Sequence, residues 1–469
     1  MFRRKRAIPN LTHIIVFDPA AIKIDNMPSR DEISYFGAGP APLPTPVIEE
    51  SAKALINFED TGLGLSEISH RSATANKILA DAKSALSTLY DFPLEGDDAY
   101  EVLFMQGGGT GEFSASVQAC VGWWVERTRR RAVAELGEGK EAEVVERVRR
   151  EIKEELKVDY LVTGSWSLKA SQEAARLIGK RYVNVATDAR KINDGKFGKI
   201  PDEKEWSLSD SKKSAMVYWC DNETVDGVEF PAFPSSLKGR GYEDGVVVAD
   251  MSSNFVSRKI NVKDYGIIFG GAQKNLGIAG IAVIMVRKSL LALTPKPEFL
   301  QQLSDVLPSA IPPVVFDFQT IAKNNSLYNT LPIFNLYVAT LVLQSLVKNF
   351  EEKKVSGQEE LAVRKATLLY QTLDKYGEAF HVVPDKSVRS RMNICFRIKP
   401  KASSGESAEA SAWDEGREKA FLAGAEKHNL MGLKGHRSVG GIRISNYNAV
   451  SLPSVHKLVA YLVEFVGTA

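Results

Sequence analysis

The sequence is poor in cysteine, has no excess of charge of either sign and lacks a long apolar run. Cys120, Cys220 and Cys395 lie far apart in apolar surroundings, which excludes a disulfide framework or a cysteine metal site. With 60 basic and 58 acidic residues, no basic field indicates a nucleic-acid partner. Polar residues interrupt the nearest candidate membrane span, Leu331 to Val347. We therefore predict a cytoplasmic globular protein with no metal, nucleic-acid or membrane partner.

The chain divides into three parts of different character. Residues 1–33 begin with a basic cluster and predict a disordered extension, with a weak transit peptide or a start at Met27 as alternatives. Residues 34–356 alternate short apolar runs with helical tracts and predict a large domain. Within this domain, the charged tract 123–157 has apolar residues every four positions and predicts a surface helical insertion. Residues 357–469 predict a smaller α+β domain.

The stretch from Tyr265 to Gly280, YGIIFGGAQKNLGIAG, contains an apolar run that ends at Gly270 and Gly271, shortly before Lys274. An apolar run closed by glycines predicts a buried strand that opens into a turn. An amine beside apolar strands loses hydration, which favours its neutral, nucleophilic form. Lys274 is therefore a candidate for a Schiff base with pyridoxal phosphate, and a surface lysine in a loop is the alternative.

A second apolar run, Val246 to Ala249, ends in Asp250. An Asp at the tip of a buried strand is costly unless a cation meets it. The protonated ring nitrogen of pyridoxal phosphate is such a cation, whereas a helix cap or a structural ion pair are the alternatives. Asp250 and Lys274 on adjacent strand tips favour the cofactor.

A glycine-rich segment, Gly107 to Gly111, separates the apolar run Val102 to Gln106 from a helical tract that begins at Glu112. A glycine turn between strand and helix exposes backbone amides at a helix N-terminus, which suits a phosphate. The segment is neither GxGxxG nor a Walker loop with its lysine, so dinucleotides and nucleoside triphosphates are disfavoured. A cofactor with one phosphate fits best.

Further short strands end just before Trp166 and Thr224. Strands that alternate with helical tracts predict an α/β fold with a parallel sheet covered on both faces. Ligands of such sheets gather at the carboxyl ends of the strands, where the glycine turn, Trp166, Thr224, Asp250 and Lys274 would all lie. The indole of Trp166 either belongs to the core or stacks on the cofactor ring.

Two basic motifs are candidates for binding anions. EISHRS contains His70 and Arg71, and LKGHRSVGGIRISNYNA contains His436, Arg437 and Arg443 in a glycine-rich turn. Arginine presents a planar fork that matches a carboxylate. For the bare His-Arg pair at 70 and 71, a solvated surface pair is the alternative.

These segments together resemble the phosphoserine aminotransferases, fold type I pyridoxal phosphate enzymes of the class V aminotransferase group. The motifs cover nearly all of residues 34–469 in the expected order: FGAGPAPLP, EISHRS, QGGGTGEF, TGSWSLKA, NETVDGVEF, ADMSSNFVSR, GAQKNLG, SLYNT, RSRMN and LKGHRSVGGIRISNYNA. The resemblance implies a large domain with a mostly parallel sheet and a smaller C-terminal α+β domain. It also implies reversible ping-pong amino transfer from L-glutamate to 3-phosphohydroxypyruvate, which gives O-phospho-L-serine and 2-oxoglutarate in L-serine biosynthesis.

The resemblance further implies roles for individual residues. Lys274 would carry the cofactor, Asp250 would meet its pyridine nitrogen, and Trp166 would stack on the ring. Other cofactor contacts are implied for Gly109, Thr110, Thr224 and Gln273, with Asn329 and Thr330 reaching the cofactor phosphate of the neighbouring subunit in a homodimer. Arg71 and Arg443 would bind substrate carboxylates, helped at the phosphate or side-chain carboxylate by His70, His436 and Arg437.

A cysteine desulfurase of the same fold is the nearest alternative. It would need a catalytic cysteine on an exposed loop, whereas the three cysteines here lie in apolar runs. A silent pyridoxal phosphate carrier is disfavoured by the complete set of Lys, Asp and Arg candidates, and a nucleotide-binding oxidoreductase is disfavoured by the glycine turn.

Overall fold

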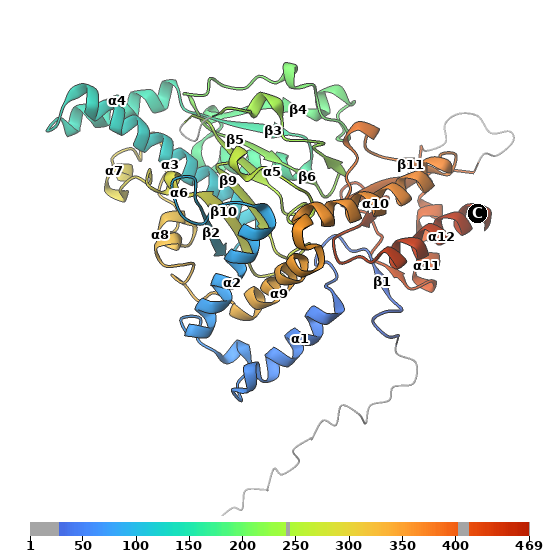
Figure 1. Ribbon diagram of the computed structural model, residues 1–469. Coiled ribbons are helices and arrows are strands. Elements are labelled where there is room, and N and C mark those ends of the chain that lie inside the picture. The colour runs from blue at the N-terminus through green and yellow to red at the C-terminus, as the bar shows by residue number, and fades with distance from the viewer. Residues whose placement is uncertain (1–27, 241–243, 402–411, 469) are drawn as a thin grey trace, which may run out of the picture.

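A seven-stranded sheet forms the centre of the molecule (Figure 1). The computed structural model describes residues 28–240, 244–401 and 412–468. The sheet order is β2-β10-β9-β8-β5-β3-β4, and among these strands β10 runs antiparallel to its neighbours. The bounds are β2 (Tyr100–Met105), β3 (Lys157–Val162), β4 (Val183–Asp188), β5 (Ser214–Cys220), β8 (Val246–Asp250), β9 (Ile267–Gly271) and β10 (Ala282–Arg287). The predicted α/β fold with a mostly parallel sheet is confirmed.

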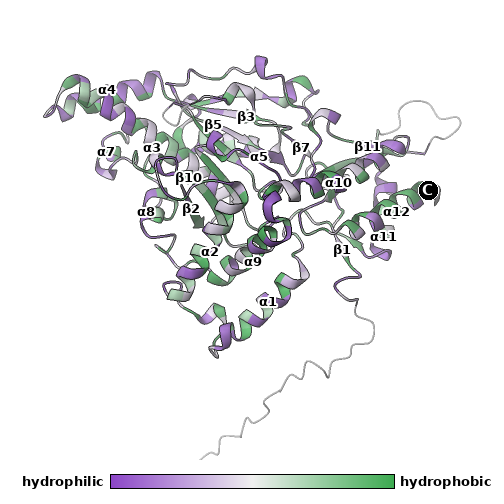
Figure 2. Ribbon diagram, viewed as in Figure 1, coloured by the Kyte–Doolittle hydropathy of each residue, from purple (hydrophilic) through white to green (hydrophobic). Residues whose placement is uncertain are grey.

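The two faces of the sheet bury different hydrophobic clusters because neighbouring residues of a strand point to opposite sides. Val102 and Phe104 of β2 pack in one cluster with α2 (Ala73–Tyr90) and α9 (Ile333–Phe350). Leu103 and Met105 pack in the other with α3 (Gly108–Leu136) and α5 (Ser165–Ile178). Figure 2 shows hydrophobic colouring along β2 and β10 between these helical layers. The apolar run from Leu331 to Val347, which was the nearest candidate for a membrane span, lies largely in α9 and packs in the first cluster.

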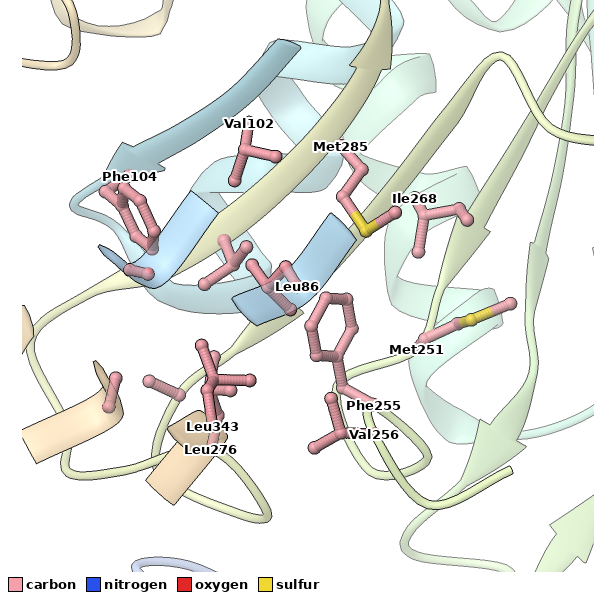
Figure 3. Close-up of a cluster of buried hydrophobic side chains, with 14 of the residues drawn as sticks. Leu86, Val102, Phe104, Met251, Phe255, Val256, Ile268, Leu276, Met285 and Leu343 are labelled. Atoms are coloured by element: carbon pink, nitrogen blue, oxygen red, sulfur yellow. The ribbon is translucent and has the colours of Figure 1, made fainter. Parts of the chain in front are cut away.

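The loops that follow β8 and β9 are anchored in the first of these clusters. Met251 follows Asp250 directly, Leu276 lies shortly after Lys274, and both are buried. Figure 3 shows them with Phe255, Leu86 and other members of the same cluster. Close packing of this kind allows little movement, so the backbone beside both candidate residues is held in place.

The glycine turn and the start of the charged tract belong to one helix. α3 begins at Gly108 and continues through Trp123 and Trp124, which are both buried against the sheet. The outward-projecting part therefore begins later than position 123, where charged residues replace apolar ones. It is completed by α4 (Glu141–Glu154), which packs back on α3 through the ion pairs of Glu151 with Arg131 and of Arg147 with Glu135.

The C-terminal part of the chain forms a smaller α+β unit. Its antiparallel sheet consists of β11 (Phe380–Val382), β12 (Asn393–Ile398) and β14 (Ile442–Ser445). The helices of this unit are α10 (Lys354–Lys375), α11 (Glu415–Lys427) and α12 (Leu452–Thr468). Near the start of the described chain, β1 (Ser34–Tyr35) pairs with β13 (Leu430–Met431). Of the extension predicted for residues 1–33, residues 1–27 lie outside the described residues.

A buried cluster of charges joins the two units. Glu229 accepts hydrogen bonds from Arg391 through the backbone nitrogen at 2.7 Å and through Nε at 3.0 Å. Arg391 also donates to Glu359 of α10 at 2.7 Å, and Arg258 lies 3.3 Å from Glu229. Burial strengthens such pairs but makes a partner left alone costly. The cluster therefore fixes the small unit against the turn after β5.

We expect the substitution Arg391→Ala to lower the free energy of unfolding by about 3 kcal/mol, because Glu229 would stay buried without its main partner. Chemical denaturation measures the change. As a control, Lys353→Ala should cost less than about 0.5 kcal/mol, because the Lys353–Glu360 pair is largely exposed. Equal losses in the two variants would contradict the role of the cluster.

Candidate active site

One cavity of about 180 Å³ lies at the carboxyl ends of the parallel strands. The turns after β2, β3, β5, β8 and β9 all contribute to it, as expected for the ligand-binding edge of such a sheet. Seven residues singled out in the sequence line it: Gly109, Thr110, Trp166, Thr224, Asp250, Gln273 and Lys274. The structure therefore brings together residues that are far apart in the chain.

The amine of Lys274 is held just beyond the carboxyl end of β9. Its Nζ donates to Oγ1 of Thr224 at 2.6 Å. Thr224 lies on the tight turn between β6 (Asn222–Glu223) and β7 (Val228–Glu229), and it is buried. The loop before Lys274 is fixed from the other side, since Gln273 accepts from the backbone of Ala41 at 2.8 Å. A half-buried primary amine on a fixed loop is suited to nucleophilic attack on a carbonyl carbon.

The carboxylate of Asp250 lies at the floor of the same cavity. It accepts from the backbone nitrogen of Ser252 at 2.9 Å, and the hydroxyl of Tyr218 donates to it at 3.5 Å. Burial raises the pKa of Asp250, while the bonds from Ser252 and the charge of Lys274 act against that rise. A cation in the cavity would stabilise the ionised form, so this position fits a protonated ring nitrogen.

The glycine turn closes the cavity on the side of α3. Gly107 and Gly108 have φ values of 126° and 59°, which other residues adopt only with strain. A side chain on Gly109 would enter the cavity, because its Cβ would lie 3.2 Å from Oγ of Ser252 and 3.8 Å from Oδ2 of Asp250. The first amides of a long helix are directed at this end. The cavity thus offers a phosphate site, an amine and a carboxylate, a donor set that fits pyridoxal phosphate.

The indole of Trp166 forms a wall of the cavity and is positioned by two buried carboxylates that the sequence analysis missed. Glu223 accepts from the backbone nitrogens of Trp166 at 2.8 Å and Ser167 at 2.9 Å. Asp226 accepts from the backbone nitrogen of Ser165 at 2.7 Å. Gly164 is required beside them, because a Cβ there would lie 2.3 Å from Glu223. The first turn of α5 is therefore capped from the β6–β7 turn.

Other contributors were also missed, among them Tyr218, Ser252 and Cys220. In the sequence, Tyr218 and Cys220 are ordinary members of the apolar run that forms β5. Only the pairing of Cys220 with Asp250 shows that this end of β5 lies at the site. Ser252 had a signal, since it lies beside Asp250 at the end of an apolar run. The NETVDG motif likewise carried a signal for Glu223 and Asp226, as two carboxylates on a short turn.

The small unit supplies cations at the border of the cavity. Arg443 of β14 donates through Nη1 to the carbonyl oxygen of Thr224 at 3.3 Å. His436 lies in the preceding loop, where its Nδ1 is 2.7 Å from Oγ of Ser438. Partial burial lowers the pKa of His436, and the charges of Arg443, Lys169 and Arg437 lower it further. Arg443 therefore offers an anion a positive charge next to the residue that holds the Lys274 amine, and the loop with His436 and Arg437 precedes it in the chain.

His70, Arg71, Asn329 and Thr330 do not line this cavity. Asn329 donates to Oε1 of Gln106, and Nε2 of Gln106 donates to the carbonyl oxygen of Thr330 at 3.2 Å. Nε2 of His70 is buried with no hydrogen-bond partner in the described part of the chain. Asn329 and Thr330 therefore lie beside Gln106, just after the end of β2.

The chain is similar to known aminotransferases in sequence and in fold. The model of the class-V aminotransferase family matches residues 137–412. The chain is 41% identical to phosphoserine aminotransferase of Saccharomyces cerevisiae, over 93% of this chain and 98% of that one. A structure that shows radiation damage of the Schiff base in a phosphoserine aminotransferase has a TM-score of 0.73 at 30% identity, and covers 93% of this chain and 99% of its own. A pyridoxal phosphate-bound phosphoserine aminotransferase from Trichomonas vaginalis has a TM-score of 0.72 at 30% identity, with coverages of 92% and 99%.

The carboxyl of Glu223 makes a pH dependence predictable. Burial and the nearby charge of Asp226 raise the pKa of Glu223 to about 8. The folded chain then holds a proton that the unfolded chain has lost, so stability falls as the pH rises from about 4.5 through 8. Glu223→Gln removes this dependence. Between pH 6 and 8 the free energy of unfolding should decrease in both proteins. We expect the decrease in Glu223→Gln to be smaller than that in the wild type by about 2 kcal/mol. Parallel stability curves in denaturant titrations would contradict the assignment.

Proposed function

Because this chain belongs to the class-V aminotransferases, and within them to the phosphoserine aminotransferases, we propose that it transfers the amino group of L-glutamate to 3-phosphohydroxypyruvate. The products are 2-oxoglutarate and O-phospho-L-serine, and the reaction is the transamination step of L-serine biosynthesis. The observation that carries the proposal is the cavity in which the Lys274 amine and the Asp250 carboxylate face one space beside a helix N-terminus.

The residues of this cavity hold a cofactor and move a proton. Pyridoxal phosphate, when bound, carries the amino group between the two substrates and accepts electron density from the substrate carbon. Asp250 would hold its ring nitrogen, Trp166 would cover its ring, and the amides of the glycine turn, with Thr110 and Gln273, would hold its phosphate. The amine of Lys274, with Thr224 as its hydrogen-bond partner, would take a proton from the substrate carbon and return it to the cofactor.

Both substrates carry two anionic ends, and the cations around the cavity are suited to them. Arg443 lies next to Thr224 and Lys274, so it would bind the carboxylate closest to the reacting carbon. His436 and Arg437 lie further out and would help to bind the second anionic end. The transfer is ping-pong because one cavity serves both substrates in turn.

We further propose that the chain acts as a cytoplasmic homodimer in which His70, Arg71, Asn329 and Thr330 serve the cavity of the partner subunit. Four large apolar side chains near the glycine turn support this proposal, since each is about 40% exposed: Ile311, Val314, Val315 and Tyr328. Phe316 of the same segment packs on Gly107 and Gly111. A partner that covered this surface would bring its own Asn329 and Thr330 close to the phosphate site. The free thiols Cys120, Cys220 and Cys395 fit a reducing compartment.

The desulfurase alternative loses support from the state of the cysteines. All three are buried, and burial raises the pKa of Cys395 to about 12. Cys220 lines the cavity, but burial raises its pKa well above the usual range as well. A thiol that stays protonated is a poor nucleophile.

The substrate assignment is tested by separating the two half-reactions. Purified enzyme loaded with pyridoxal phosphate is treated with L-glutamate, and the change in visible absorbance is recorded. A panel of keto acids is then added to the aminated enzyme. We expect 3-phosphohydroxypyruvate to reverse the change at least about 100-fold faster than pyruvate, because only the phosphorylated acid pairs with the outer cations. Equal rates across the panel would contradict the proposed substrate.

Replacing Lys274 by Ala should reduce turnover by at least about 1,000-fold, because no other amine lines the cavity among the described residues. The unfolding midpoint should stay near the wild-type value. Lys180→Ala, an exposed lysine after α5, serves as the control and should keep full turnover. In the wild type, borohydride treatment followed by peptide mapping should place the label on Lys274, and a label elsewhere would contradict the assignment.

A further inference from the structure

A lysine outside the sequence-predicted set lies against the cavity wall. Lys169 is on α5, one turn after Trp166, and its Nζ is 4.3 Å from the centroid of the Trp166 ring. The indole lines the cavity with Lys274, so the ammonium lies beside the cavity. Attraction between a cation and an aromatic face holds such an ammonium in a defined place.

This cation has no counter-ion in the described part of the chain. Its Nζ is in none of the ion pairs or hydrogen bonds to carboxylates found among residues 28–240, 244–401 and 412–468. Its charge acts on the carboxyl of Asp226, where it opposes the rise in pKa that burial causes. Asp226 is buried and already accepts from the backbone and the hydroxyl of Ser165. Lys169 itself is exposed, so it can receive an anion from solvent.

Lys169 is close to the cations of the small unit. Its charge, with those of Arg443 and Arg437, lowers the pKa of His436. Four basic groups from two distant parts of the chain are therefore near one another, with Lys169 on the Trp166 indole and Arg443 on the Thr224 turn. Like charges brought together in this way repel one another, and a bound anion with more than one negative charge would relieve that repulsion best.

We propose that Lys169 is a specificity-determining residue whose ammonium binds the phosphate group of the phosphorylated keto acid. This inference rests on the proposed function and deepens it. A phosphate monoester carries close to two negative charges at neutral pH and three acceptor oxygens, whereas the side-chain carboxylate of glutamate carries one. An additional unpaired cation therefore raises affinity for the phosphorylated substrate more than for glutamate, and does nothing for a substrate without a second anionic end.

The test compares Lys169→Met with the wild type on three substrates. For 3-phosphohydroxypyruvate we expect kcat/KM to fall about tenfold, mostly through KM, because one charge-assisted hydrogen bond is lost. For glutamate we expect a loss of about threefold, and for unphosphorylated hydroxypyruvate less than about twofold. Lys169→Arg should restore most of the activity towards the phosphorylated substrate, since it keeps the charge and the contact with the indole.

Two controls separate this role from others. Lys180→Met removes an exposed lysine just beyond the other end of α5 and should leave all three kcat/KM values within about twofold. The visible spectrum of the bound cofactor should be the same in Lys169→Met and the wild type, which shows that Trp166 still covers the ring. Equal losses on all three substrates, or an altered spectrum, would overturn the inference in favour of a role through Trp166. If the wild type itself failed to use 3-phosphohydroxypyruvate, the proposed function would fall instead.

Discussion

The site depends on the parallel pairing of β8 with β9. The register places Asp250 opposite Phe269, so the turn after β9 carries Lys274 past the end of β8 and over the carboxylate. Each strand is buried on both faces, which makes any shift of register costly. The distance between the amine and the acid is therefore set by the sheet and not by the loops alone. The turns after β2, β3 and β5 complete the cavity around this pair.

The sequence was sufficient to predict the large features. Apolar runs closed by glycine or Asp indicated strands whose ends carry chemistry, and the glycine turn indicated a phosphate site. Long-range pairing decided what could not be predicted. Glu223 reaches Trp166 only because β5 and β3 are neighbours, and Tyr218 reaches Asp250 only because β5 pairs with β8. Likewise, Trp123 and Trp124 adjoin a charged tract, and only tertiary packing shows that they belong to the core.

The acidic and the basic residues of the site come from different units. The large unit contributes buried acids to the site, namely Asp250, Glu223 and Asp226, and burial raises the pKa of each. The small unit contributes cations on one loop and on β14. Arg443 bonds to the β6–β7 turn that also holds Thr224, so the two sets meet at a single turn. A substrate bound there contacts both units, and its anionic ends compensate the cations of the small one.

The close approach of Gly164 to Glu223 limits which substitutions the two positions can accept during evolution. No side chain fits at position 164 while a glutamate occupies position 223, and a shorter residue at 223 would leave the first amides of α5 without acceptors. Two sites that are distant in the chain can therefore change only as a pair. Natural variants should show this as correlated substitution, with single replacements at either site being rare.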